Sequence, residues 1–305
     1  MKTKHILWFG ISVLVLLTMF FIPSVYSFSE EDQEGYSIFH VTMVDMTWQE
    51  VEQAAKDGAI ILTNTSVIEE HGPHMGCGID AYLGYQMCKM VRQNLEAKGI
   101  KTLIAPPFFW GINRTSHVFP GTFTVRVETM KAVLHDIFSS LKNMGFTTVF
   151  NINSHGDGLH IQTAVESVRN ARDELGLDIK YMLSDFDAKR SGLMDEVPPF
   201  LLIHKTADMS EVIAQKYMDL HAGAWETGAV AAYFPDVLNE EKARQLKDSE
   251  TTVDQIQEWV QNMKKVTPLG YLGDPSKFDA EAGRKEMEEN CTHMADAIAD
   301  YLKNK

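Results

Sequence analysis

The feature that most constrains the fold is a regular alternation of short apolar runs with longer amphipathic segments. The runs have the length and composition of buried strands and lie at residues 59–64, 102–107, 147–153 and 179–184. Helical patterns occupy residues 47–58, 82–99, 128–145 and 159–176, and each range ends at a glycine. The alternation predicts an α/β fold: a single domain with a mainly parallel β-sheet flanked by helices on both faces.

One helix has an additional signal, and one more helix is expected. Thr47 followed by Glu50 has the spacing of a capping box and marks the start of the first helix. Another helix is expected around Glu211 to Leu220, directly before the stretch HAGAWETG.

The N-terminus has the layout of a secretory signal. Two lysines precede the apolar run 6–22, and small polar residues follow it. We expect residues 1–27 to be a signal peptide or an N-terminal membrane anchor, residues 28–44 a lead-in segment and residues 45–305 the folded domain. The length of the run suits cleavage as well as anchoring. Both readings predict export to the periplasm or the extracellular space.

The composition limits the classes of binding partner that we expect. The 305-residue chain has a formal net charge of -14 and 45% hydrophobic residues. Such an acidic globular protein is not expected to bind nucleic acid, and it is expected at a membrane only if the N-terminal run stays uncleaved. A small-molecule substrate is the expected partner.

Three polar clusters follow predicted strands or helices. VIEEHGPHMGCGID follows the first strand, NSHGDG follows the run at 147–153, and HAGAWETG covers residues 221–228. The carboxyl ends of parallel strands meet at one edge of a sheet, where ligands bind. The clusters are therefore predicted to form one site.

The residue types in these clusters suit a metal. Glu69, His71 and Asp80 combine carboxylates with an imidazole, which are ligands for zinc, manganese or iron. A solvated acidic loop explains the same residues equally well when they are taken alone. His155 and Asp157 have an ordinary explanation too, as a hydrogen-bonded histidine and a turn residue.

Taken together, the clusters resemble the creatininase (creatinine amidohydrolase) family. EEHGPHMGCGID is similar to the family's EQHGPHLP…TD signature, and FFWGINRTSHVFPGT to its YG-x-S-x-x-H-x-x-FPGT segment. NINSHGDG, HAGAWETG and GYLGDPSKFDAEAG match three further family segments in the same order. The resemblance extends from about residue 45 to residue 300.

The resemblance implies a site with two divalent metal ions (zinc, manganese or iron) in a chain that forms a homo-oligomer, a hexamer in the family. Glu69 and His155 would bind one ion, His71 the other, and Asp80 would bridge them. The fifth protein ligand is left open between Asp157 and Glu226, because family members differ at these places.

The remaining candidate residues also come from the resemblance. His221 corresponds to the family's proton-transfer histidine, and Glu226 stands in the same catalytic segment. Trp225 and His117 are candidates for substrate binding. Two departures stand out: Asp157 is one methylene shorter than the family's glutamate, and Glu70 replaces the usual glutamine.

The predicted function is a dinuclear metal-dependent amidohydrolase. It would cleave a C–N amide bond of a small substrate, cyclic or otherwise non-peptide, by attack of metal-bound hydroxide. His221 would then protonate the leaving nitrogen. The alternatives are a peptidase that releases a terminal residue, a hydrolase that opens a cyclic ketone, and a non-catalytic binding protein.

Overall fold

The computed structural model describes residues 39–190, 192–206 and 216–305. All elements named below belong to residues 36–305, which form one compact unit. The predicted signal or anchor and most of the lead-in segment lie outside the described residues. Among the residues that are described, no helix is long and apolar enough to cross a membrane.

Five parallel strands form one sheet in the order β2-β1-β3-β4-β5. The strands are β1 (Ile60–Thr65), β2 (Thr102–Ile104), β3 (Thr148–Asn153), β4 (Asp178–Ser184) and β5 (Leu201–His204). β2 is shorter than predicted, since Pro106 and Pro107 have no N–H to donate to a neighbouring strand. β5 was not predicted from the sequence.

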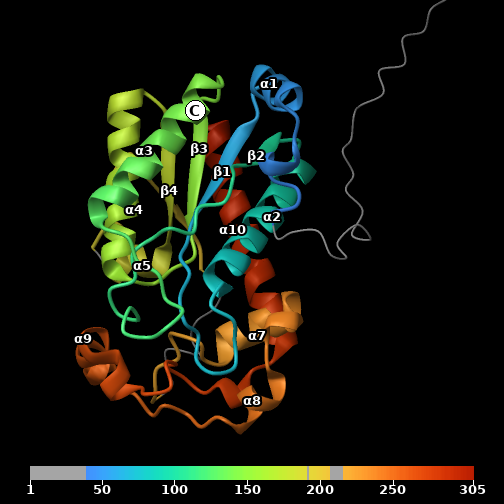
Figure 1. The fold of residues 1–305 in the computed structure, drawn as a ribbon. Helices are drawn as coiled ribbons and strands as arrows, with labels where there is room; N and C mark the ends of the chain where they lie inside the picture. The colour runs from blue at the N-terminus through green and yellow to red at the C-terminus, as the bar shows by residue number, and fades with distance from the viewer. Residues whose placement is uncertain (1–38, 191, 207–215) are drawn as a thin grey trace, which may run out of the picture. The chain divides into compact units, whose positions relative to one another are not determined.

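Helices cover both faces of the sheet, as the sequence predicted (Figure 1). α2 (Ile79–Ala97) and α10 (Ala280–Lys303) pack on one face, and α3 (Val127–Asn143) and α4 (Gly158–Leu175) on the other. The side chains of β1 alternate between the two faces: Ile60 and Leu62 pack in the core beside α2 and α10, and Ile61 packs in the core beside α3 and α4. A strand buried on both faces reads as the continuous apolar run seen in the sequence.

The other elements lie at the two ends of the sheet. They are α1 (Trp48–Lys56), α5 (Asp185–Arg190), α7 (Ala224–Tyr233), α8 (Glu240–Gln245) and α9 (Ile256–Val266), with 3-10 turns η2 (Met43–Asp45), η3 (Pro235–Val237), η4 (Val253–Gln255) and η5 (Pro275–Lys277). In Figure 1, α7, α8 and α9 gather at one end of the sheet. The capping box is confirmed at α1, where Thr47 Oγ1 accepts from the Glu50 N–H and Glu50 accepts from the Thr47 N–H.

The helix expected around Glu211 to Leu220 falls partly outside the described residues. Residues 216–220 are described and are not helical. Their backbone bonds other segments instead: the Met218 N–H donates to Thr251 O at 2.8 Å and the Leu220 N–H to Leu272 O at 3.0 Å. The prediction is wrong for these residues, because tertiary hydrogen bonds replace the helical ones.

Two glycines bring α7 and α10 into close contact. A side chain at Gly228 would overlap the backbone of Asp279, and one at Gly283 would overlap the backbone of α7 around Ala229. The contact fixes the position of α7, which carries Glu226. Gly283 is the last residue of the GDP…G segment seen in the sequence, so this glycine is explained by packing.

Candidate metal centre

The candidate site lies where the strand order changes direction. The chain leaves β1 with β2 on one side and β3 on the other, which is the place where open parallel sheets bind ligands. The loop after β1 supplies Glu69 and His71, and the end of β3 leads to His155. Asp80 lies in the first turn of α2, which begins at Ile79, three residues before the start that the sequence predicted. Glu226 lies in the first turn of α7.

Glu69, Asp80 and His155 form one group that could hold a metal ion. His155 Nδ1 lies 3.1 Å from Glu69 Oε2 and 3.5 Å from Asp80 Oδ2. The other ring nitrogen, Nε2, lies 3.2 Å from the carbonyl of Ile112. A carbonyl only accepts, so Nε2 carries the proton and Nδ1 is left as the ligand atom.

His71, Asp80 and Glu226 form a second group that shares Asp80 with the first. His71 Nε2 lies 3.9 Å from Glu226 Oε2 and 4.0 Å from Asp80 Oδ2. His71 Nδ1 is 3.0 Å from the Glu69 carbonyl, so Nε2 again faces the group as an unprotonated nitrogen.

Two atoms of this second group are buried without a hydrogen-bond partner: His71 Nε2 and Asp80 Oδ2. Buried polar atoms normally have partners. Zinc binds nitrogen and oxygen at about 2 Å, so ligand atoms on one ion lie roughly 3 to 4 Å apart. The observed separations suit a shared cation and are too long for hydrogen bonds.

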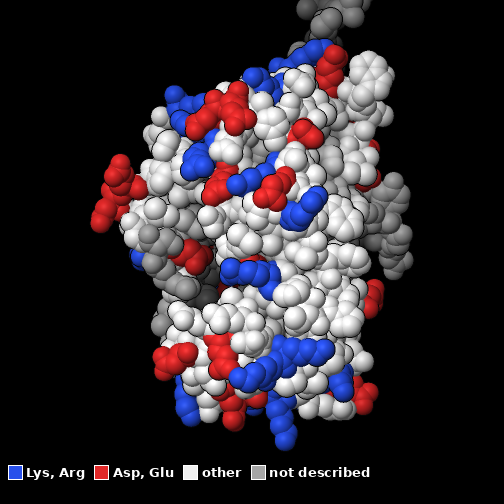
Figure 2. All heavy atoms as spheres, turned by 60° about the vertical axis from the view of Figure 1, so that its left-hand side comes forward, with Lys and Arg blue, Asp and Glu red and all other residues white. Residues whose placement is uncertain are grey.

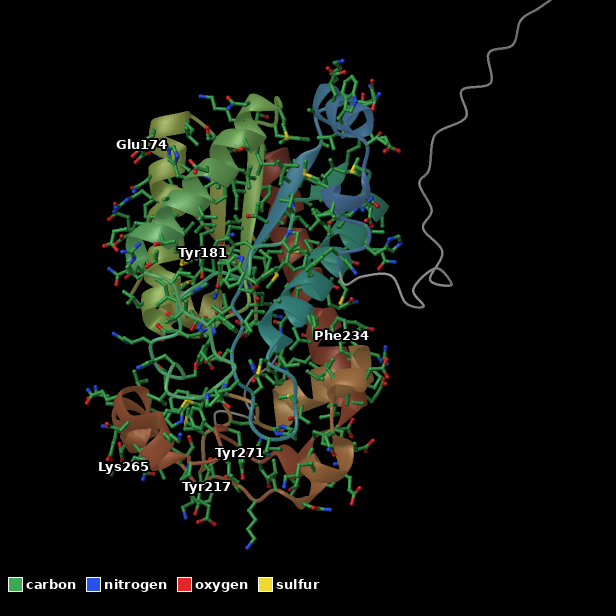
Figure 3. The ribbon with its side chains drawn as sticks, in the orientation of Figure 1. Glu174, Tyr181, Tyr217, Phe234, Lys265 and Tyr271 are labelled. Atoms are coloured by element: carbon green, nitrogen blue, oxygen red, sulfur yellow. The ribbon has the colours of Figure 1, made fainter. Side chains whose placement is uncertain are left out.

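His221 lies beside both of these groups and forms a third possible metal-holding group with Glu69 and His71. Its Nδ1 lies 4.0 Å from Glu69 Oε2, and its Nε2 lies 2.9 Å from the Glu70 carbonyl oxygen. The His221 backbone exchanges hydrogen bonds with the backbone of Leu272. Figure 3 labels the preceding residue, Tyr271, at the end of the sheet where α7 and α9 lie. This pairing fixes the ring beside the carboxylates.

The carboxylates and imidazoles perturb one another strongly. Burial alone would raise the pKa of Glu69, but His155, His221 and His71 outweigh it and hold that pKa below its usual range. Burial would lower the pKa of His155, yet Glu69 and Asp80 raise it well above its usual value. Burial raises the pKa of Asp80, although His155 partly opposes the shift.

The two residues beside α7 follow the same pattern. Burial raises the pKa of Glu226. Burial would lower the pKa of His221, but Glu69, Glu70 and Glu226 outweigh it and raise the pKa to about 10. Within the described part of the chain, no lysine or arginine forms an ion pair with the carboxylates of this site. The cluster therefore suits a cationic ligand.

Asp157 lies outside these groups. Its Oδ1 accepts from the Leu159 N–H at 2.8 Å and caps α4, and its Oδ2 accepts from the Arg114 N–H at 2.8 Å and the Thr115 N–H at 3.2 Å. Both oxygens are thus held by backbone. Of the two residues left open by the sequence, Glu226 is the one that the fold brings to His71 and Asp80.

The two candidates for substrate binding also lie outside the groups. Trp225 is 38% exposed and hydrogen bonds Glu286 of α10. It precedes Glu226 on α7 and so points about 100° away from that carboxylate. His117 is exposed, and its Nδ1 is 2.6 Å from the Arg114 carbonyl.

Sequence reasoning missed Asp219. Its Oδ2 accepts from the Ala224 N–H at 2.7 Å at the start of α7. The carboxylate packs so closely on Gly223 and Gly273 that neither position has room for a side chain. Asp219 thereby holds the segment between His221 and Glu226 in place. The GDP stretch that contains Gly273 was the available signal, but nothing in it pointed to Asp219 as the partner.

The chain matches the family described as "Creatininase: Creatinine amidohydrolase" over residues 44–298. The chain belongs to the creatininase family. This confirms the resemblance seen in the sequence, and it makes the chain a member of a family of metal-dependent amidohydrolases.

Three relatives have different names. A creatinine amidohydrolase of Pseudomonas putida is 24% identical over 208 residues, which are 64% of this chain and 72% of that protein. A 3-dehydro-scyllo-inosose hydrolase of Thermotoga maritima is 24% identical over 65% of this chain and 58% of its own length. A mycofactocin precursor peptide peptidase of Mycobacterium ulcerans is 23% identical over 76% of this chain and 82% of its own length.

Solved creatininase structures have the same fold. One superposes with a TM-score of 0.65 at 21% identity and covers 86% of this chain and 97% of the other. Two further creatininase structures are named for their metals, one as "Creatininase Mn" and one mutant as "Zn-Zn type".

Proposed function

We propose that the chain is a hydrolase that uses two divalent metal ions to cleave a C–N amide bond of a small substrate. The observation that carries this proposal is Asp80, which belongs to both ligand groups and whose Oδ2 is buried without a hydrogen-bond partner. Manganese and zinc in related structures support the choice of metals.

Different side chains of this site would bind the two ions. Glu69 and His155 would bind one ion, His71 and Glu226 the other, and Asp80 would contact both. The bound ions would supply a nucleophile from water at neutral pH and polarise the carbonyl of the substrate. Five ligands from four different segments fix the geometry before substrate arrives, which favours catalysis.

His221 is placed to move a proton. Its Nε2 faces the Glu70 carbonyl and its Nδ1 faces the carboxylate of Glu69. Nδ1 is therefore the nitrogen directed at the centre, where it can give a proton to the leaving nitrogen.

The substrate class is tested with three kinds of compound that follow the names of the relatives. The purified, metal-loaded protein is incubated with creatinine and other small cyclic amides, with peptides from which a terminal residue can be released, and with a cyclic polyhydroxy ketone. Products are detected by mass spectrometry, and His221→Gln is the control. We expect turnover of a cyclic amide that requires His221. Turnover of only the peptide or only the ketone would replace the amide proposal by that alternative.

We also propose export and self-association. The apolar run 6–22 in the sequence supports export, and fractionation with N-terminal sequencing of the mature protein would test it. On the face drawn in Figure 2, acidic and basic side chains are interspersed, which suits contact with other proteins better than with nucleic acid. Light scattering after size exclusion would show only the mass of a single chain, at most about 34 kDa, if the homo-oligomer proposal is wrong.

A further inference from the structure

Glu70 places a buried carboxylate behind His221. Its side chain is almost fully buried, and its Oε2 accepts from the Gly72 N–H at 2.9 Å. Its Oε1 is buried, has no hydrogen-bond partner and lies 3.5 Å from His221 Nε2. A buried carboxylate oxygen without a donor is costly, so its position calls for an explanation.

The main chain of the same residue faces the same nitrogen. The Glu70 carbonyl oxygen lies 2.9 Å from His221 Nε2, while the Glu70 N–H donates to Thr122 Oγ1 at 3.0 Å. Both oxygens near Nε2 can only accept, so this nitrogen carries a proton. His221 Nδ1 is then directed toward Glu69 at the metal centre.

The absence of a side chain at Gly270 leaves room for the Glu70 carboxylate. Gly270 has a φ of +77°, and a side chain there would overlap the carboxylate of Glu70. The segment that contains Gly270 continues into Leu272, which pairs with the backbone of His221. The carboxylate therefore fills a gap between the loop after β1 and the segment that bears His221.

The chemistry of a carboxylate explains why a glutamate fits this gap. A glutamate has acceptors on both oxygens: Oε2 accepts from the Gly72 N–H, and Oε1 lies 3.5 Å from the protonated His221 Nε2, where its charge can act on the Nε2–H. A glutamine in its place would offer one acceptor and would turn its NH₂ group toward one of these two donors. A glutamate at residue 70 therefore gives His221 surroundings that a glutamine would not.

We propose that the Glu70 side chain is a positioning residue for His221: together with its own carbonyl it holds the Nε2–H and directs Nδ1 toward the metal centre. The inference rests on the proposed proton transfer by His221. It adds a residue whose proposed effect on the site passes through His221.

The test measures the His221 ring directly in zinc-loaded protein. Proton and nitrogen NMR signals of the ring are assigned by their loss in His221→Gln. They are then compared in wild type, Glu70→Gln, Glu70→Ala and the matched surface control Glu166→Gln. We expect a low-field Nε2–H proton in wild type and in the control. We expect it to move upfield in Glu70→Gln and further in Glu70→Ala, because charge-assisted hydrogen bonds are the stronger ones.

Kinetics give a second readout on whichever amide the substrate screen identifies. General acid catalysis is worth about 10²- to 10⁴-fold, so a misplaced acid should lower kcat about tenfold in Glu70→Ala while KM stays within about twofold. Ring signals and kcat equal to wild type in Glu70→Ala would overturn the proposal. If Glu70→Ala fails to fold, the same comparison in Glu70→Gln decides.

The two proposals fail in different ways. The ring signals are observed without substrate, so they test the positioning role even if no amide is cleaved. Wild-type protein that takes up no zinc would instead contradict the proposed function, and the ring signals would then be compared in the metal-free variants.

Discussion

Asp80 Oδ2 lies 4.0 Å from His71 Nε2, and both atoms are buried without a hydrogen-bond partner. Asp80 comes from the first turn of α2 and His71 from the loop after β1. The loop returns to the helix because the Glu69 N–H donates to Cys77 O at 2.9 Å. The separation is larger than a hydrogen bond and suits two ligands of one ion.

Glu226 and Asp157 are expected to respond differently to truncation. Glu226→Ala removes a ligand of the second group, so bound metal should fall from about two ions per chain to about one. Asp157→Ala removes the cap of α4 and should lower the free energy of unfolding by about 1 to 2 kcal/mol with both ions retained. Metal analysis and urea unfolding of the two variants check this. Loss of metal in Asp157→Ala alone would show that the two roles are reversed.

Removal of metal should destabilise the protein. The site gathers buried carboxylates that no lysine or arginine of the described residues neutralises, and a ligand that binds only the folded state stabilises it. Dialysis against a chelator should therefore lower Tm, and added zinc or manganese should restore it. A Tm that is the same with and without chelator would contradict the assignment of these residues as ligands.

The close contact of α7 with α10 should be sensitive to a single methyl group. Gly283→Ala would force the helices apart, so we expect a loss of about 1 to 3 kcal/mol in the free energy of unfolding. Weaker metal binding should accompany it, because α7 carries Glu226. Gly158→Ala is the matched control, since a side chain there meets no atoms within 4 Å. Equal effects of the two substitutions would exclude a packing role for Gly283.

Glu286 is predicted to make stability depend on pH. Burial raises its pKa to about 7, with Glu289 and Asp219 adding to the shift and the hydrogen bond from Trp225 opposing it. The folded state therefore binds more protons than the unfolded state between the ordinary pKa of 4.5 and about 7. Stability contributed by this group is present below pH 4.5 and is lost as the pH rises through 7.

Glu286→Gln removes this dependence. Urea unfolding at about pH 5 and pH 8 should show that the free energy of unfolding of the variant rises relative to that of wild type as the pH rises. Trp225, which hydrogen bonds Glu286, contributes to the fluorescence signal of unfolding. A constant difference between the two proteins at both pH values would mean that Glu286 does not titrate in this range.

The fold was largely predictable because its signals are local. The apolar run at β1 and the capping box of Thr47 and Glu50 depend on neighbours in the sequence, and both are confirmed. β5 was missed because its four residues, Leu201–His204, are too short for a periodicity. The segment 216–220 was predicted as helix because its bonds to Thr251 and Leu272 are invisible in the sequence.

Most residues of the candidate site could be predicted from the sequence, but their arrangement in space could not. Glu69, His71, Asp80 and His155 were named from motifs, and the fold brings them together. The sequence could not choose between Asp157 and Glu226, because the choice depends on which backbone groups surround each carboxylate. The contact between Glu70 and His221 joins residues 151 positions apart, and no local pattern encodes it.

The most direct test of the account is the number of metal ions bound per chain in wild type, Asp80→Ala and the exposed control Asp136→Ala. Each protein is loaded with zinc or manganese, freed of excess metal by gel filtration and analysed by elemental mass spectrometry. Because Asp80 belongs to both ligand groups, we predict about two ions in wild type and in the control, and loss of both in Asp80→Ala. Wild-type protein without bound metal, or Asp80→Ala with as much metal as wild type, would contradict the account.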